Sequence, residues 1–208
     1  MQRIIFFGSS TEFSPAVLQK LVLSAQIKVL SVVTTEDKPV GRHLVITPNP
    51  IKVLAQKLGI PVYDKIGDFL MTTNDYSMTI GIVAAYGKIL GPKTLSKLNN
   101  HIYGIHPSLL PKYRGPSPLQ QQILDGITET GVTIFKIDLG EDTGPIVAVA
   151  HDIIHPDDTT VSLGNRLFEI GVNWFIENLC TTPLPPPKLG GGGRQDGGGT
   201  PQDHSQAT

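Results

Sequence analysis

The chain has 208 residues, of which 39% are hydrophobic and 17% charged, which suits one globular domain with a sizeable core. Its formal net charge of −1 excludes binding to nucleic acid through overall positive charge, so any RNA contact has to come from a local basic patch. The single cysteine, Cys180, excludes a disulfide framework within the chain, and no apolar run approaches the ~20 residues that a transmembrane helix needs. We therefore expect a cytoplasmic protein without a membrane partner.

The first half of the chain alternates short apolar runs with helical patterns. The predicted strands are residues 4–7, 29–33, 78–85 and 102–106. Ser14 and Pro15 supply an N-cap and a first helical position, and a second helix is predicted over residues 50–58 with Gly59 as its C-terminal stop. Such alternation predicts βαβ units, and hence a Rossmann-like α/β fold with a mostly parallel sheet flanked by helices.

Right-handed crossovers place the loops that follow parallel strands along one edge of the sheet, where α/β proteins bind ligands. The second half begins differently, because residues 130–137 and 146–153 are predicted to form a hairpin-like edge. A closing helix is predicted over residues 162–178. Residues 181–208 contain 5 Pro and 7 Gly and almost no apolar residues, so we expect a domain over residues 1–180 followed by a disordered linker.

Two polar residues follow neighbouring predicted strands. His106 ends the fourth strand, and Asp142 lies in the loop of the predicted hairpin, so the two side chains could face each other across a cleft as a general acid/base pair. Asp138 and Glu141 are competing carboxylates in the same loop. The remaining histidines show no metal-ligand spacing with each other or with Cys180, so no metal is expected.

Two loops have more than one interpretation. The turn Gly8-Ser9-Ser10 is either structural or a substrate contact, and its single glycine is not a dinucleotide fingerprint. The segment 34–50 carries Lys38 and Arg42 among Gly and Pro residues. It is either a solvated loop or a local contact for nucleic acid.

Two strings narrow the interpretation further: HPSLLPKYRGPSPLQQQILDG from His106, and ETGVTIFKIDLGEDTGPI from Glu129. Together with RIIFFGSSTEF and AAYGKIL they closely resemble the folate-dependent formyltransferases, over roughly residues 2–178. The resemblance is greatest to the members that formylate methionyl-tRNA. It implies transfer of a formyl group from 10-formyltetrahydrofolate to the α-amine of charged initiator tRNA, with His106 and Asp142 as the catalytic pair.

The resemblance also implies binding residues. The folate pocket would be lined by Ser108, Leu109, Leu110 and Pro111, with Tyr86, Gly87 and Ile89 as another wall. Arg42 and Lys38 would contact tRNA. The end of the tail resembles the connection to a second, RNA-binding domain, which we expect to be absent here. We expect a monomer.

The chain departs from the family at residue 104, where Gly104 replaces the asparagine of the Asn-x-His motif. In a strand, residues 104 and 106 point to the same face, so an asparagine at 104 could donate to the charge that develops beside His106. We therefore expect impaired activity, and an asparagine introduced at 104 is expected to cost little stability. Two alternatives stay open: a formyltransferase acting on a small amine, such as a sugar nucleotide or glycinamide ribonucleotide, and a non-catalytic folate-binding module.

Overall fold

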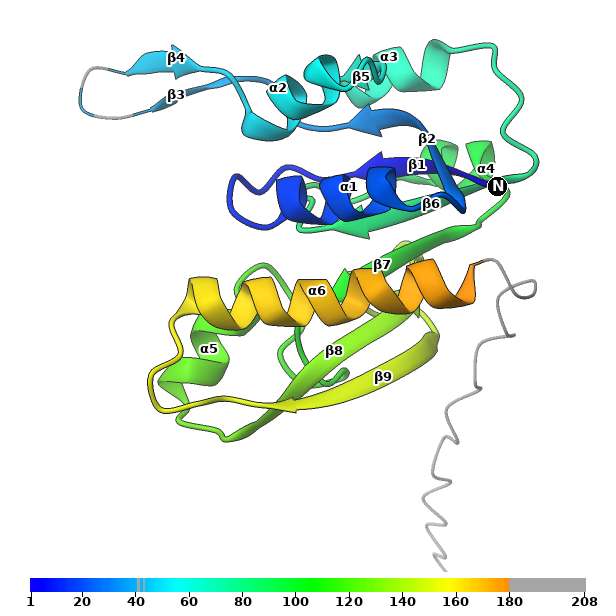
Figure 1. The fold of residues 1–208 in the computed structure, drawn as a ribbon. Helices are drawn as coiled ribbons and strands as arrows, with labels where there is room; N and C mark the ends of the chain where they lie inside the picture. The colour runs from blue at the N-terminus through cyan, green and yellow to red at the C-terminus, as the bar shows by residue number, and fades with distance from the viewer. Residues whose placement is uncertain (41, 43, 180–208) are drawn as a thin grey trace, which may run out of the picture.

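The computed structural model describes residues 1–40, 42 and 44–179. The strands are β1 (Gln2–Phe7), β2 (Ile27–Val33), β3 (Lys38–Val40), β4 (Val45–Thr47), β5 (Val62–Tyr63), β6 (Thr79–Ala84), β7 (Ile102–His106), β8 (Glu129–Lys136) and β9 (Ile146–Ile153). The helices are α1 (Ser14–Leu23), α2 (Pro50–Lys57), α3 (Ile66–Met71), α4 (Pro92–Lys97), α5 (Pro118–Leu124) and α6 (Thr160–Asn178). Figure 1 shows their arrangement.

Seven strands form one sheet in the order β5-β2-β1-β6-β7-β8-β9. The first five are parallel, and β8 and β9 are antiparallel to their neighbours. The predicted mostly parallel α/β sheet with a hairpin at its edge is therefore confirmed. Within the described residues, no helix is both long and apolar enough to cross a membrane.

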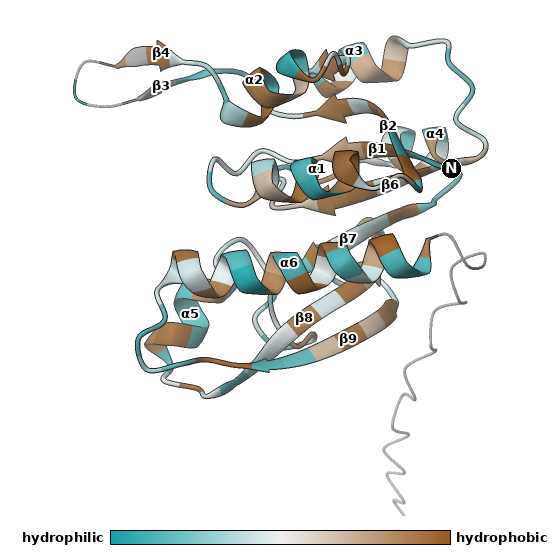
Figure 2. Cartoon of the chain, viewed as in Figure 1, coloured by the Kyte–Doolittle hydropathy of each residue, from teal (hydrophilic) through white to brown (hydrophobic). Residues whose placement is uncertain are grey.

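The sheet is covered on both faces because its central strands are apolar throughout. In β1, Ile4 and Phe6 pack into one buried cluster with residues of α1, α2 and α6. Ile5 and Phe7 point the other way into a second cluster, which also holds residues of α3 and α4. Figure 2 shows these apolar strands in brown, with α6 alternating between apolar and polar bands.

The helix boundaries follow local capping chemistry. The Asn49 side chain accepts a hydrogen bond from the Ile51 N–H at the start of α2, and Gly59 follows the helix with a φ of 69°. The expected N-cap of α1 is wrong: Ser14 is the first helical residue and is fully buried, and its hydroxyl donates to the Ala84 carbonyl. Ser10 Oγ instead accepts hydrogen bonds from the N–H groups of residues 12 and 13.

The segment between β2 and α2 was expected to be a loop, but much of it forms the antiparallel hairpin β3–β4, which projects from the body of the domain (Figure 1). Lys52 holds its base through ion pairs with Asp37 and Asp64, at 3.0 and 2.8 Å. Asn49 adds hydrogen bonds from its side chain to the hydroxyls of Thr34 and Thr35. The hairpin is therefore anchored where it leaves the sheet.

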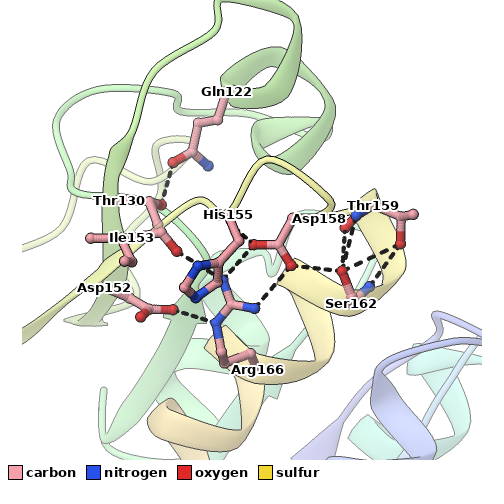
Figure 3. A network of polar contacts seen from close by, with 9 residues as sticks. All are labelled: Gln122, Thr130, Asp152, Ile153, His155, Asp158, Thr159, Ser162 and Arg166. Atoms are coloured by element: carbon pink, nitrogen blue, oxygen red, sulfur yellow. Dashed lines mark hydrogen bonds and ion pairs between the residues drawn. The ribbon is translucent and has the colours of Figure 1, made fainter.

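A polar network fixes the start of α6 against β9 (Figure 3). Arg166 on α6 pairs with Asp152 on β9 at 2.7 Å and with Asp158 at 2.6 Å, and its guanidinium also donates to the Ile153 carbonyl. Thr159 and Ser162 form a capping box at the same helix end. This network joins the last strand of the sheet to the helix that covers it.

Candidate active site

A cavity of about 470 Å³ opens at the carboxyl ends of β1, β6 and β7, bounded on one side by the loop between β8 and β9. This is the sheet edge at which the sequence predicted that the ligand-binding loops would meet. His106 and Asp142 both line it, together with Gly104, Tyr86, Gly87 and Ile89. The structure thus brings these six predicted site residues into one place.

His106 is the last residue of β7 and is only 6% exposed. Its Nε2 lies 2.7 Å from the Tyr113 carbonyl oxygen, and its Nδ1 lies 3.4 Å from Asp142 Oδ2. A carbonyl can only accept, so Nε2 carries a proton. In the neutral imidazole, Nδ1 is then the basic nitrogen, and it faces the carboxylate. A proton placed on Nδ1 would therefore lie between the imidazole and the carboxylate, the arrangement that a general acid/base pair needs.

Asp142 is the carboxylate that faces the imidazole, and its two rivals are placed elsewhere. Asp138 closes its own loop by accepting hydrogen bonds from the Gly140 N–H at 3.0 Å and the Thr143 hydroxyl at 2.8 Å. Glu141 lines the cavity from an exposed position, and among the described residues the carboxylate that pairs with His106 is that of Asp142. Geometry therefore separates three carboxylates that the sequence places within five residues.

The loop from Tyr113 to Gly115 contacts both members of the pair. Tyr113 accepts from His106 Nε2, and the Gly115 N–H donates to Asp142 Oδ2 at 2.9 Å. Tyr113 and Asp142 have φ values of 56° and 50°, in the left-handed region that non-glycine residues rarely adopt, and Gly115 has a φ of 95°. Backbone strain of this kind is common where a structure holds functional groups in a set orientation.

The turn Ser108-Leu109-Leu110-Pro111, expected to line the folate pocket, is not among the residues that line the cavity. Ser108 is fully buried and its carbonyl accepts from the Thr133 hydroxyl at 2.7 Å, while that hydroxyl accepts from the Leu110 N–H at 3.1 Å. Gln122, also buried, donates to the Pro107 carbonyl at 2.9 Å. In this structure the turn and its partners support the chain directly after His106.

Tyr86, Gly87 and Ile89 line the cavity as expected. Tyr86 lies against Phe7 in an edge-to-face arrangement with centroids 5.9 Å apart. Burial raises the pKa of Tyr86 to about 12, so its hydroxyl stays protonated at neutral pH and is available as a donor. Ile89 is 72% exposed and gives this side of the cavity an apolar rim.

The turn at Gly8-Ser9-Ser10 holds two strand ends together, and the Ser9 and Ser10 side chains also line the cavity, where they can contact a substrate. The N–H groups of Ser9 and Ser10 donate to the Ala85 carbonyl at 3.1 and 3.0 Å, and Ser9 Oγ accepts from the Gly87 N–H at 2.9 Å. These contacts tie the end of β1 to the end of β6. Because the two amides already have partners, they do not form an open anion site.

Gly104 lies in the cavity wall, but the place of its missing side chain is filled. A Cβ built at 104 would meet Phe135 Cε1 at 2.5 Å, Phe135 Cζ at 2.8 Å and Ile137 Cδ1 at 2.9 Å. A side chain at 104 therefore requires the Phe135 ring and Ile137 to shift, a cost that the expectation of little stability loss on introducing asparagine did not include. The sequence could not show this, because it depends on the register that pairs Gly104 with Phe135.

The two predicted tRNA contacts lie on the projecting hairpin. Lys38 begins β3 and Arg42 lies at the turn, and both are exposed. They lie apart from the His106–Asp142 pair and do not line the cavity. Lys52, which is close in sequence, is already paired with two carboxylates, and the predicted linker at residues 181–208 lies outside the described part of the chain.

Other contacts in the site had no sequence signal. Tyr113 contacts His106 through its backbone carbonyl, which every residue type carries. Phe135 lines the cavity, but in the sequence it is indistinguishable from any apolar strand residue. Gly115 alone could have been found, since a glycine after a turn indicates a positive φ. Among the described residues, no group of three or more His, Cys, Asp or Glu side chains is arranged to hold a metal ion.

Comparisons with known proteins identify relatives over nearly the whole described domain. The family described as formyl transferase matches residues 2–179. A protein named methionyl-tRNA formyltransferase from Roseiflexus castenholzii is 39% identical over 99% of this chain and 64% of its own length. One of the same name from Chloroflexus aggregans is 40% identical over 99% and 64%. The chain thus spans a little under two thirds of these relatives.

Solved structures share the fold at lower identity. Glycinamide ribonucleotide transformylase 1 from Symbiobacterium toebii superimposes with a TM-score of 0.70 at 21% sequence identity, over 86% of each chain. At this identity the likeness concerns the fold.

Proposed function

The chain belongs to the formyl transferase family, and we propose that it transfers a formyl group from 10-formyltetrahydrofolate to the α-amine of methionyl-tRNA. The observation that carries the proposal is the His106–Asp142 pair, held in the wall of a cavity of about 470 Å³. The likeness to methionyl-tRNA formyltransferases over 99% of the chain supports the choice of amine. Translation initiation would place the protein in the cytoplasm, where we expect it to act as a monomer.

The cavity suits a flat heterocycle with polar edges. Val83, Leu90, Phe135 and Ile137 supply apolar walls, and the loop that carries Asp138 and Asp142 lies beside them. Its volume lies within the range of small-molecule sites, which combine apolar walls with a few placed polar groups. We therefore assign the folate contact to the cavity walls, including Tyr86, Gly87 and Ile89. The buried turn at residues 108–111 would not touch the folate, and would support the position of His106 through its hydrogen bond with Thr133.

When bound, 10-formyltetrahydrofolate supplies a formyl group on nitrogen that an amine can attack. The chain's own residues then have three tasks. The cavity walls exclude water from the reacting groups. His106 Nδ1 and Asp142 share the proton released by the attacking amine, and the protonated imidazole stabilises negative charge that develops on the formyl oxygen. The Tyr113 carbonyl keeps Nε2 protonated, so Nδ1 would take up the proton of the amine. Nδ1 would then deliver that proton to the folate nitrogen that carried the formyl group, as the bond between that nitrogen and the formyl carbon breaks and tetrahydrofolate leaves.

The hairpin β3–β4 favours a large substrate over a small one. It projects beyond the body of the domain (Figure 1), with Lys38 and Arg42 exposed. Lys52 fixes the base of the hairpin through its two ion pairs. Two cations on a projecting arm can approach phosphates of an RNA that reaches into the cavity from outside. A small amine would not need this arm. We propose that Arg42 and Lys38 contact the tRNA backbone.

The test is a formyl-transfer assay with 10-formyltetrahydrofolate and three acceptors: methionyl-tRNA, glycinamide ribonucleotide and an amino-sugar nucleotide. The proposal expects turnover with methionyl-tRNA that is lost in His106→Asn. Turnover only with a small amine would replace the proposed substrate. Folate binding by calorimetry, without turnover on any acceptor, would support a binding module instead.

A further inference from the structure

Gly104 and Phe135 are cross-strand partners in the β7–β8 pair. The Phe135 ring occupies the space that a side chain at 104 would take, since the nearest ring atoms, Cε1 and Cζ, lie 2.5 and 2.8 Å from a Cβ built there. Phe135 is 3% exposed although it lines the cavity. An aromatic ring over a cross-strand glycine restores the packing that the glycine leaves out. The two residues therefore form one packing unit.

The same ring packs against His106. The two ring planes are nearly perpendicular, at 89°, with centroids 6.3 Å apart. Tyr113 and Asp142 each contact one nitrogen of the imidazole. Phe135 instead packs against the imidazole ring with its own ring. The Nδ1–Oδ2 separation of 3.4 Å is long for a hydrogen bond, so this contact alone fixes the ring weakly.

We propose that Phe135 is a positioning residue that acts through His106, holding the imidazole so that Nδ1 faces Asp142, and that Gly104 is required to give its ring room. The effect on turnover rests on the proposed formyl transfer. The effects on packing and on the imidazole do not depend on it. Four variants test both: Gly104→Ala, Phe135→Leu, the double variant Gly104→Ala/Phe135→Leu, and the control Phe69→Leu.

The packing test uses thermal unfolding. Gly104→Ala is expected to lower Tm by roughly 4–8 °C, because the added Cβ overpacks against Cε1 and Cζ of Phe135. Leucine lacks both atoms, so adding Ala at 104 should cost little once Phe135 is replaced. The Tm of the double variant should therefore lie well above the value expected if the two single losses of Tm were added. Strict additivity would show that Gly104 and Phe135 are not one packing unit.

The positioning test reads His106 directly by NMR of its labelled imidazole, without substrate. The parent should show a proton held on Nε2, and Phe135→Leu should show exchange between orientations or tautomers. Phe69→Leu is the control, because Phe69 is fully buried in the second cluster and packs on Phe7, Tyr63 and Tyr76 rather than on His106. Phe69→Leu should lower Tm about as much as Phe135→Leu does, but the imidazole signals of His106 in this variant should match those of the parent.

In the transfer assay, Phe135→Leu should lower kcat by roughly 10- to 100-fold with little change in KM, and the double variant should recover part of that loss. Unchanged imidazole signals and unchanged kcat in Phe135→Leu would overturn the positioning role. If the parent transfers no formyl group but the imidazole responds as expected, the proposed function fails while the positioning role stands.

Discussion

The Gly115 N–H donates to Asp142 Oδ2 at 2.9 Å, and this is the same carboxylate oxygen that lies 3.4 Å from His106 Nδ1. Gly115 is two residues beyond Tyr113, whose carbonyl holds the other imidazole nitrogen. One short loop therefore sets the orientation of both members of the pair. Since the backbone of this loop supplies these contacts, a substitution at Asp142 can remove the charge of the side chain while the loop keeps its conformation.

Asp142→Asn should retain the shape of the side chain and a hydrogen bond from Gly115, but it removes the proton acceptor. General acid/base contributions are typically about 10²–10⁴-fold, so we expect single-turnover formyl transfer to slow by that order. Tm should change by no more than a few degrees. Near-parental transfer at saturating substrates would show that His106 acts without Asp142.

Arg42→Ala should weaken the use of methionyl-tRNA, because one cation on the projecting hairpin is lost. The slope of log KM for methionyl-tRNA against log salt concentration should fall by about 1, while KM for the folate stays the same. Lys28→Ala is the matched control, since Lys28 is an exposed cation near the start of β2, at the opposite edge of the sheet from the cavity. An equal effect of both variants would mean that the hairpin makes no local contact.

The Arg166–Asp158 network predicts how stability depends on pH (Figure 3). The Arg166 guanidinium, helped by hydrogen bonds from the His155 N–H and the Ser162 hydroxyl, holds the pKa of Asp158 well below its ordinary value. An unfolded aspartate titrates near pH ~3.9. Because the folded-state pKa is lower, the stabilisation is present in full above about pH 5 and is lost as the pH falls towards the folded-state pKa.

Asp158→Asn should accordingly lower the free energy of unfolding by about 1–3 kcal/mol at pH 7, because it removes one charge from a hydrogen-bonded pair. Urea unfolding at pH 7, 4 and 3 should show the difference from the parent shrinking as the pH falls below about 5, so that it is smaller at pH 4 than at pH 7 and smallest at pH 3. Asp157→Asn, at the exposed neighbouring position, controls for the loss of a charge. A difference that stays constant with pH would show that the ion pair is not its source.

The parts of the fold that could be predicted have strong local patterns. The β8–β9 hairpin follows from two β-rich runs around one loop, and His106 and Asp142 follow from their positions after strands and from the family resemblance. The hairpin β3–β4 was missed because its strands have three residues each, too short for a clear alternation. Phe135 was missed for another reason: its role depends on pairing with Gly104, 31 positions away in the chain (135 − 104).

The final prediction concerns Gly104→Asn, which introduces the asparagine of the family motif into the space that the Phe135 ring occupies. Alone, it should destabilise the domain by about 1–3 kcal/mol, because the new side chain overpacks against Phe135 and Ile137. Such a variant should not be faster than the parent, since the amide can enter only by displacing the ring that packs on His106.

Combined with Phe135→Leu, the asparagine has room, and its side chain lies on the same strand face as His106. The comparison that isolates the amide is Gly104→Asn/Phe135→Leu against Gly104→Ala/Phe135→Leu, because the two differ only beyond Cβ. Removing one preorganised donor to a developing oxyanion typically costs about 10²–10³-fold in kcat. The asparagine variant should therefore exceed the alanine variant by up to that factor, with equal KM for the folate. Equal kcat values in the two double variants would show that residue 104 does not face the charge that develops during transfer.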